Sequence, residues 1–256
     1  MCEDGIVVTD DFVAVIDGST SKSPLQIDPS VKNGRLCMLL ISDFIRGMKG
    51  DTTCSAFCNE ITQYIADVYG AHDMCTTRLQ AHPTERLTAS VIVYSKAKNE
   101  VWMVGDCQCI VDGQLHENLK PGEAMIANER AEYIQEMLKK GRRVSDLQLI
   151  DDGRKAILPQ LIASCEMQNI EYAVVDGFPI PLDKVKIISI KDKGLPVVLA
   201  SDGYPFLADT LEKSEGMLQE LLCEDPLCID KFKATKGLMR GSGSYDDRSY
   251  IRFLKD

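Results

Sequence analysis

Acidic residues follow apolar, strand-forming segments at three separate places in this sequence. They are Asp17 after residues 13–16, Asp106 after residues 102–104, and Asp202 after residues 197–200. A further acidic pair, Asp246 and Asp247, opens a last strand-forming segment. If these strands share one core, their ends bring several carboxylates to one edge, where so much negative charge is costly unless a divalent cation neutralises it. The pattern therefore predicts a metal site.

A plainer explanation exists for each acid taken alone. Asp-Gly pairs are common in turns, because the Asp side chain bonds its own backbone and Gly adopts positive φ. We assign the pairs at 112–113 and 176–177 to turns of this kind. The ten cysteines mostly lie in apolar segments, as Cys37, Cys165 and Cys223 do, and lack the paired Cys-x2-Cys spacing of structural zinc. We expect most of them to be reduced core thiols.

Short strands and helices must position the acids. Alternating apolar residues predict a hairpin of residues 6–8 and 12–16, which would set Glu3 and Asp4 near Asp17. Helical spacing predicts helices over residues 36–45, 53–69 (capped by Asp51 or Thr52), 129–140, 154–168, 207–223 and 226–235. Further strands are predicted at 88–94, 100–104 and 107–111, as one antiparallel meander, and at 172–175, 185–190, 197–200 and 249–254. Because strands cluster rather than alternate with helices, antiparallel sheets are favoured.

Composition limits the class of protein. The 256 residues are 45% hydrophobic and 27% charged, as in ordinary globular chains, and no linker divides residues 1–256, so we expect a single domain. The formal charge of −10 argues against nucleic acid or an anionic membrane as partner, because the long-range field would repel both. No run approaches the roughly 20 apolar residues of a membrane span, and residues 1–4 carry no signal region. We therefore expect a cytoplasmic location.

Six short motifs occur in a fixed order along the chain. They are Glu-Asp at 3–4, Val-Ile-Asp-Gly at 15–18, Leu-Thr-Ala-Ser at 87–90, Val-Gly-Asp at 104–106, Ala-Ser-Asp-Gly at 200–203 and Asp-Asp-Arg-Ser at 246–249. In order and approximate spacing, over nearly the whole chain, this series resembles the metal-dependent serine/threonine protein phosphatases of the phosphatase 2C (PPM) class. The resemblance implies an α+β fold: a four-layer α/β/β/α sandwich of two antiparallel sheets flanked by helices, with the metal site at one end.

The resemblance also implies roles for individual residues. The implied metal ligands are Glu3, Asp17, the Gly18 carbonyl, Asp202, Asp246 and, for a weak third ion, Asp106. Asp17 would bridge two ions, Glu3 would bind one of them, and Asp202 with Asp246 would bind the other. Asp4 would hold a metal-bound water. These roles make Asp17 and Asp4 the expected catalytic residues.

The implied chemistry is hydrolysis of phosphoserine or phosphothreonine esters in a phosphorylated protein. Two divalent ions about 4 Å apart can share a water, lower its pKa towards about 7 and stabilise the phosphoryl oxygens as charge moves to the leaving oxygen. Carboxylate oxygens favour Mg²⁺ or Mn²⁺ over zinc or copper as these ions. No protein nucleophile is needed, in agreement with the lack of a Ser/His/Asp or Cys/Arg signature.

Two departures from the family pattern matter. The family commonly has a phosphate-binding arginine a few residues before its Glu-Asp pair, but here only Met1 and Cys2 precede Glu3. The family also often has Asp-Gly-His-Gly or Asp-Gly-Met-Gly at the bridging aspartate, whereas Ser and Thr follow Gly18 here, so the proposed general-acid histidine has no counterpart. Lys22 could supply the lost positive charge to the substrate phosphate, as a point charge. The alternative is a solvated loop lysine.

These departures leave two rival functions open. One is a catalytically weak or silent phosphatase-like module that uses its acidic rim for binding or sensing. The other is a phosphatase for a small phosphorylated metabolite, for which a short or open flap around residues 120–143 would be expected. The complete set of acidic ligands favours an enzyme over the binding module. The sequence does not decide between a protein and a metabolite as the substrate.

Overall fold

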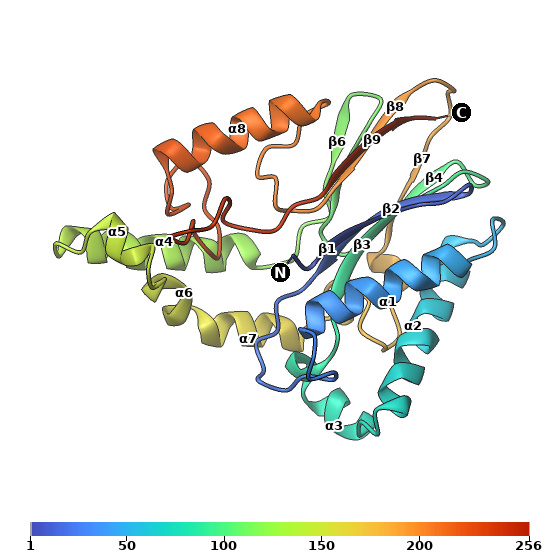
Figure 1. Cartoon of the computed structure of the whole chain (residues 1–256), viewed down its shortest axis with the longest axis horizontal. Helices are drawn as coiled ribbons and strands as arrows, with labels where there is room; N and C mark the ends of the chain where they lie inside the picture. Colours follow the sequence, from blue (N-terminus) through green and yellow to red (C-terminus); the bar gives the residue numbers. More distant parts are fainter. Residues whose placement is uncertain (1, 256) are drawn as a thin grey trace.

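Two antiparallel β-sheets packed face to face form the centre of the structure, a computed structural model that describes residues 2–255 (Figure 1). The five-stranded sheet has the order β1 (Asp4–Val8), β2 (Phe12–Gly18), β3 (Ala89–Ser95), β4 (Glu100–Val104) and β7 (Lys186–Ser189). The four-stranded sheet has the order β6 (Gln114–His116), β5 (Gln108–Val111), β8 (Pro196–Ala200) and β9 (Tyr250–Leu254). Every neighbouring pair is antiparallel.

Helices cover both outer faces. Helices α1 (Asn33–Gly47) and α2 (Cys54–Ala71) lie over the five-stranded sheet, and α8 (Leu211–Glu224) lies over the four-stranded one (Figure 1). The remaining helices are α3 (Thr76–Ala81), α4 (Glu123–Lys139), α5 (Val144–Leu147), α6 (Asp152–Ala156) and α7 (Leu158–Glu166), with 3-10 turns at Pro83–Glu85 and Leu182–Lys184. The predicted four-layer α+β sandwich is confirmed.

The alternating pattern of the strands explains the two cores. In β2, Ala14 and Ile16 pack against the helices, whereas Val15 lies between the sheets. Leu199 of β8 reaches the same inter-sheet core from the other side. Because β3 is the central strand of its sheet, all seven of its residues are buried. Each sheet thus has one face for helices and one for its partner sheet.

The predicted meander of residues 88–111 is wrong. Strands β3 and β4 do pair, but the chain then leaves this sheet at Gly105, and β5 pairs with β6 and β8 in the other sheet. The apolar, alternating pattern of a strand does not specify which of two sheets it joins. The crossing matters for function, because it carries Asp106 to the end of both sheets.

Proline and a buried carboxylate account for two helix predictions that are wrong. The single helix expected over 154–168 is two helices, α6 and α7, which divide at Ile157 just before Pro159. Residues 226–235 form no helix, because the Asp225 carboxylate accepts the backbone N–H groups of 229–231 that would otherwise bond within a helix. The strand expected over 172–175 reduces to isolated bridges, such as Val175 with Ala89.

Other expectations differ only in detail. Helix α2 is capped by Thr53, whose Oγ1 accepts the Ala56 N–H, rather than by Asp51 or Thr52. Helix α4 begins at Glu123, six residues before the predicted start. All cysteines within residues 2–255 are free thiols, as expected, but Cys223 is exposed rather than part of a core.

Two expectations concern the chain as a whole. The single domain predicted over residues 1–256 stays a prediction, and its first and last residues lie outside the described part. No helix within residues 2–255 is both long and apolar enough to cross a membrane.

Candidate metal centre

The β1–β2 hairpin supplies two of the acids. Asp4 is paired with Asp17 in the antiparallel register, so both lie at the same end of the sheet. Side chains alternate along β2, and Asp17, two residues after Val15, faces the space between the two sheets. The predicted hairpin is confirmed, and it brings Asp4 beside Asp17.

Asp106 lies where the chain crosses between the sheets. Gly105 has a φ of +99°, and a Cβ there would lie 2.2 Å from Ser90 Oγ, so the crossing requires glycine. Ser90 Oγ donates a 2.5 Å hydrogen bond to Asp106 Oδ1. Because Ser90 is opposite Asp17 in the β2–β3 register, this bond holds Asp106 near that acid.

Asp202 follows β8, at the end of the second sheet. The residue before it, Ser201, donates a 2.6 Å hydrogen bond from Oγ to Asp4 Oδ2, which joins the two sheets at the site. The backbone N–H of Glu3 donates to Asp247 Oδ2 at 2.7 Å, which brings the segment before β9 to the same place. Four distant segments therefore meet here.

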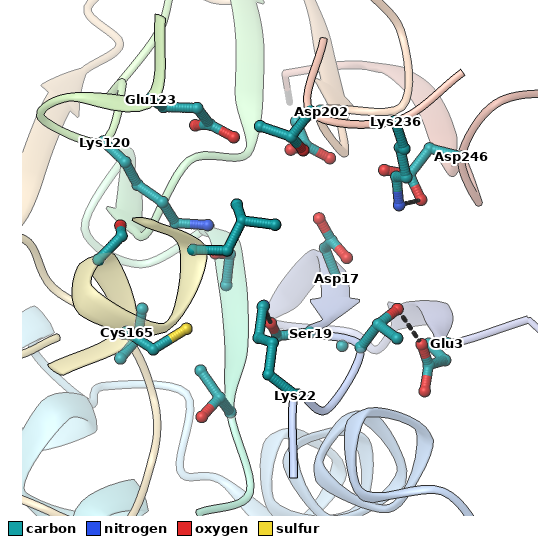
Figure 2. Close-up of a pocket in the computed structure, with 18 of the residues that line it drawn as sticks. Glu3, Asp17, Ser19, Lys22, Lys120, Glu123, Cys165, Asp202, Lys236 and Asp246 are labelled. Carbon is teal, nitrogen blue, oxygen red and sulfur yellow. Dashed lines mark hydrogen bonds and ion pairs between the residues drawn. The ribbon is translucent and has the colours of Figure 1, made fainter. Parts of the chain in front are cut away.

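The carboxylates of Asp17, Asp106 and Asp202 form the densest acidic group of the site. Each offers an oxygen, and these oxygens all lie within 4.8 Å of one another. Figure 2 shows Asp17 pointing toward Asp202 and Asp246. Burial raises the pKa of Asp17 and of Asp202 well above the usual range, and neighbouring carboxylates add to both shifts. Such a group would be stabilised by a cation.

Two lysines pair with acids of the site. Lys120 Nζ lies 2.5 Å from Asp106 Oδ2, and Lys236 Nζ pairs with Asp246 Oδ1 (Figure 2). Burial opposes ionisation of Asp106, but the charge and hydrogen bond of Lys120 together with the Ser90 hydrogen bond lower its pKa. The protein thus carries its own counter-ions for two of the acids.

Glu3 and Asp4 have buried carboxylate oxygens that accept no hydrogen bond. Thr20 Oγ1 donates to Glu3 Oε2 at 2.7 Å, but Glu3 Oε1 has no partner, and neither does Asp4 Oδ1. Only 6% of Glu3 and 8% of Asp4 is exposed. A buried carboxylate oxygen without a donor costs free energy, which a hard cation or its bound water would recover. The residues of this site therefore fit a Mg²⁺ or Mn²⁺ centre.

A cavity of about 140 Å³ opens beside these acids. Its lining includes the acids Glu3, Asp4, Asp17, Glu123, Asp202, Asp246 and Asp247 and the cations Lys22, Lys120, Arg154 and Lys236. Burial lowers the pKa of Lys22, whose Nζ donates to Ser19 Oγ at 3.3 Å. Lys22 is therefore a half-buried residue of the cavity wall.

The structure brings most of the predicted site residues to this one cavity. Glu3, Asp4, Asp17, Gly18, Lys22, Asp202 and Asp246 all line it, and Asp106 joins them through its contact with Asp17 and Asp202. Glu3 and Asp246 lie outside the tight group of three acids, although both face the cavity. Strand β9 begins only at Tyr250, so strand alternation does not choose between Asp246 and Asp247, and both line the cavity.

Sequence reasoning identified Lys22 but missed the other three cations of the cavity and Cys165. Lys120 lies at the start of residues 120–143, where a flap was considered, and that was the only available signal for it. Arg154 was assigned to a helix, and Lys236 carried no signal at all. The thiol of Cys165 also faces the cavity (Figure 2), although it was expected in a core.

Comparisons with known proteins find similarity at the level of structure. No protein-family model matches the chain, and no curated protein matches its sequence. The catalytic domain of the serine/threonine protein phosphatase PstP, solved with two manganese ions, aligns with 100% of this chain and 93% of its own, at 13% identity and a TM-score of 0.46.

Two further solved structures are similar to the same degree. RsbX in complex with magnesium aligns with 100% of this chain and 88% of its own, at 12% identity and a TM-score of 0.47. The serine/threonine phosphatase Stp1 from Staphylococcus aureus aligns with 100% and 89%, at 13% identity and a TM-score of 0.45. These values are too low to assign an activity, so the function is argued from the residues of the site.

Proposed function

We propose that this chain is a Mg²⁺- or Mn²⁺-dependent phosphatase that hydrolyses phosphoserine or phosphothreonine esters of a protein substrate. The observation that carries the proposal is the pair of buried, unpartnered oxygens, Glu3 Oε1 and Asp4 Oδ1, beside the carboxylates of Asp17 and Asp202. Acids placed only for stability would have donors for these oxygens. Cations that line the same cavity could contact a phosphate group.

Each acid has a distinct part in the proposal. Asp17, with the Gly18 carbonyl, would hold both ions, Glu3 would hold one, and Asp202 with Asp246 would hold the other. When bound, the ions would activate a water and neutralise charge on the phosphoryl group. Asp4, oriented by the Ser201 hydrogen bond, would accept a hydrogen bond from that water.

Lys120 and Lys236 compete with metal ions for two of the acids. Asp246 is paired with Lys236 through Oδ1, so it would bind an ion through Oδ2 or after Lys236 moves away. Asp106 is paired with Lys120, which opposes binding of a third ion there. We therefore propose two ions, with the third site weak.

The helices beside the site favour a protein substrate over a metabolite. Residues 123–166 contain α4, α5, α6 and α7, which extend from one end of the sandwich (Figure 1). A metabolite enzyme was expected to have a short or open flap in this region. Residues of α6 and α7 instead line the cavity, so the region is neither short nor open.

A binding or sensing module is the second candidate. One observation favours it. Lys120 and Lys236 already neutralise two of the acids, so a bound metal ion would relieve less charge repulsion at the site. Such a module would bind metal or a partner without turnover.

Phosphate release decides between the two candidates. The substrates are a phosphothreonine peptide and p-nitrophenyl phosphate, each with Mn²⁺, Mg²⁺ or EDTA, and the variants are Asp17→Asn and Asp202→Asn. We expect metal-dependent turnover that falls at least a hundredfold in both variants, on the order of 3 kcal/mol of transition-state stabilisation. Asp112→Asn is the matched control, because Asp112 is exposed in the β5–β6 turn and should keep full activity. Metal binding without turnover would establish the binding module instead.

A further inference from the structure

Two cations of the cavity wall have no carboxylate partner. Arg154 lies on α6 and Lys22 in the loop after β2, and both are half-buried. Within residues 2–255, Lys120 and Lys236 form ion pairs with acids of the site, whereas Arg154 and Lys22 form none. Neither of these two cations therefore has an ion-pair partner among the described residues.

Arg154 is held in place but keeps free donors. Its backbone N–H donates to Asp151 Oδ1 at 2.8 Å, which caps α6, and Asp151 is itself paired with the buried Arg130 at 2.8 Å. Its Nη1 donates to the carbonyl oxygen of Thr235 at 3.0 Å and to Thr235 Oγ1 at 3.2 Å. A guanidinium has five N–H donors, so Nε and Nη2 remain for a ligand. Little side-chain freedom would be lost on binding one.

Burial leaves both cations poorly solvated. It lowers the pKa of Arg154 and of Lys22, and for Lys22 the nearby positive charges of Lys120, Arg154 and Lys236 lower the pKa further. For Arg154 the charges of Asp246 and Asp151 oppose the lowering of the pKa. A bound anion would replace the lost water around both cations and remove the repulsion on Lys22.

We propose that Arg154 is the phosphate-recognising residue of this cavity and that, together with Lys22, it binds the terminal oxygens of a phosphate monoester dianion. The inference rests on the proposed function and goes beyond it by naming the residue that recognises the substrate. The family commonly binds phosphate with an arginine just before its Glu-Asp pair. Here Arg154, on α6, would bind the phosphate instead. Two unpaired cations match the two charges of a monoester, so a phosphodiester, with one charge, should bind less well.

The position of Arg154 on α6 gives the helices beside the site a direct part in binding. Because α6 supplies Arg154, the region from α4 to α7 would not merely cover the site but would contact the phosphate itself. Thr235, which holds the guanidinium, lies just before Lys236, so the loop that pairs with Asp246 would also position Arg154.

Binding of inorganic phosphate tests the proposal without turnover. Calorimetric titration is done on EDTA-treated and on Mg²⁺-loaded protein, for the native chain, Arg154→Ala, Arg154→Lys and Lys155→Ala. Hydrogen bonds to charged groups predict roughly a tenfold to hundredfold loss of phosphate affinity in Arg154→Ala. Arg154→Lys should recover part of it, as a point charge. Lys155→Ala removes an exposed charge on the same helix, paired with Asp152 at 3.5 Å, and should change nothing.

Chemical modification gives a second readout that needs no variant. Phenylglyoxal should modify Arg154 in the free protein, and inorganic phosphate should protect it, with the exposed Arg143 as an internal control that phosphate does not protect. Peptide mass spectrometry measures both. Phosphate affinity unchanged in Arg154→Ala, or no protection of Arg154, would overturn the proposal.

The outcomes separate this inference from the proposed function. Metal-dependent turnover with an unchanged KM and phosphate affinity in Arg154→Ala would contradict only the role of Arg154. Phosphate binding that depends on Arg154, in a protein without turnover, would support that role and contradict the phosphatase. With turnover present, we expect the KM for p-nitrophenyl phosphate to rise about tenfold or more in Arg154→Ala, while kcat changes less.

Discussion

The dipeptide Asp-Gly occurs at residues 17–18 and at residues 176–177, and its aspartate has a different role at each place. Asp176 accepts hydrogen bonds from Arg86 Nη1 at 2.8 Å, Gln168 Nε2 at 2.9 Å, Asn169 Nδ2 at 2.7 Å and the Phe178 N–H at 2.9 Å. Asp17 instead faces other carboxylates.

Electrostatics separates the two acids as clearly as hydrogen bonding does. Burial raises the pKa of both, but the Arg86 guanidinium opposes the rise at Asp176, whereas the carboxylates of Asp4 and Asp106 add to it at Asp17. A buried carboxylate whose oxygens accept hydrogen bonds, such as that of Asp176, stabilises the fold. A buried carboxylate among other carboxylates, such as that of Asp17, is stabilised only when a cation binds. Completeness of partners, rather than the motif, distinguishes a structural acid from a functional one.

Removal of the structural acid should have the largest effect on stability. Asp176→Ala leaves the Arg86 guanidinium buried without its carboxylate, so we expect a loss of about 3–5 kcal/mol in the free energy of unfolding. Urea unfolding followed by circular dichroism measures it. The double variant Arg86→Met with Asp176→Ala should regain part of the loss. A loss below about 1 kcal/mol would show that the two acids do not differ in this way.

The pH dependence of the metal-free protein comes next. Burial raises the pKa of Asp4 from 3.8 to about 6 in the folded state, so between about pH 4 and pH 6 the folded state binds more protons than the unfolded state. Stability in EDTA should therefore rise by up to about 3 kcal/mol as the pH falls through this window, and fall again as the pH rises through it. Asp4→Asn should lose this contribution and keep only the pH dependence of the other buried acids. A flat profile in the native chain would contradict the predicted shift.

Metal should stabilise the protein through the acidic site that contains Asp17. At a free Mg²⁺ or Mn²⁺ concentration of 100 times Kd, the native protein should gain about 2.7 kcal/mol, because the ion binds only the folded state. Thermal unfolding with and without EDTA measures this gain as a rise in Tm. Asp112→Asn should keep the gain and Asp17→Asn should lose it. An equal Tm with EDTA and with Mn²⁺ in the native chain would contradict the metal centre.

The smallest expected effect is an increase in stability when the charge of Asp17 is removed. Asp17→Asn takes one charge out of a repulsive group, so in EDTA we expect it to raise the free energy of unfolding by on the order of 1 kcal/mol. Urea unfolding in EDTA measures this change beside that of Asp176→Ala. The two substitutions should thus differ in sign. Destabilisation by Asp17→Asn would place Asp17 with the structural acids.

The local part of the site could be predicted from the sequence. Period-two alternation defines the β1–β2 hairpin, and its register follows from the short turn, so Asp4 beside Asp17 was within reach of sequence reasoning. The acid after β8 likewise follows from a strand that ends in Ser201-Asp202. These features depend only on residues close in the chain.

The long-range part could not be predicted. Whether β5 continues the sheet of β4 or joins the other sheet depends on how the two sheets pack as a whole, so the crossing at Gly105 was missed. The pairing of Lys120 with Asp106, and of Arg154 with Thr235, depends on side chains that meet only after folding. A lysine or arginine in the sequence does not indicate which acid, if any, it will contact.

The hydrogen bond from the Glu3 backbone to Asp247 joins residues 244 positions apart. During translation the N-terminal hairpin can form early, but its acids stay without their partners until the segment before β9 has left the ribosome. The full set of acids can therefore assemble only after residues 246–247 have been made. The proposed metal centre would thus report on the folding of nearly all the chain between Glu3 and Asp247.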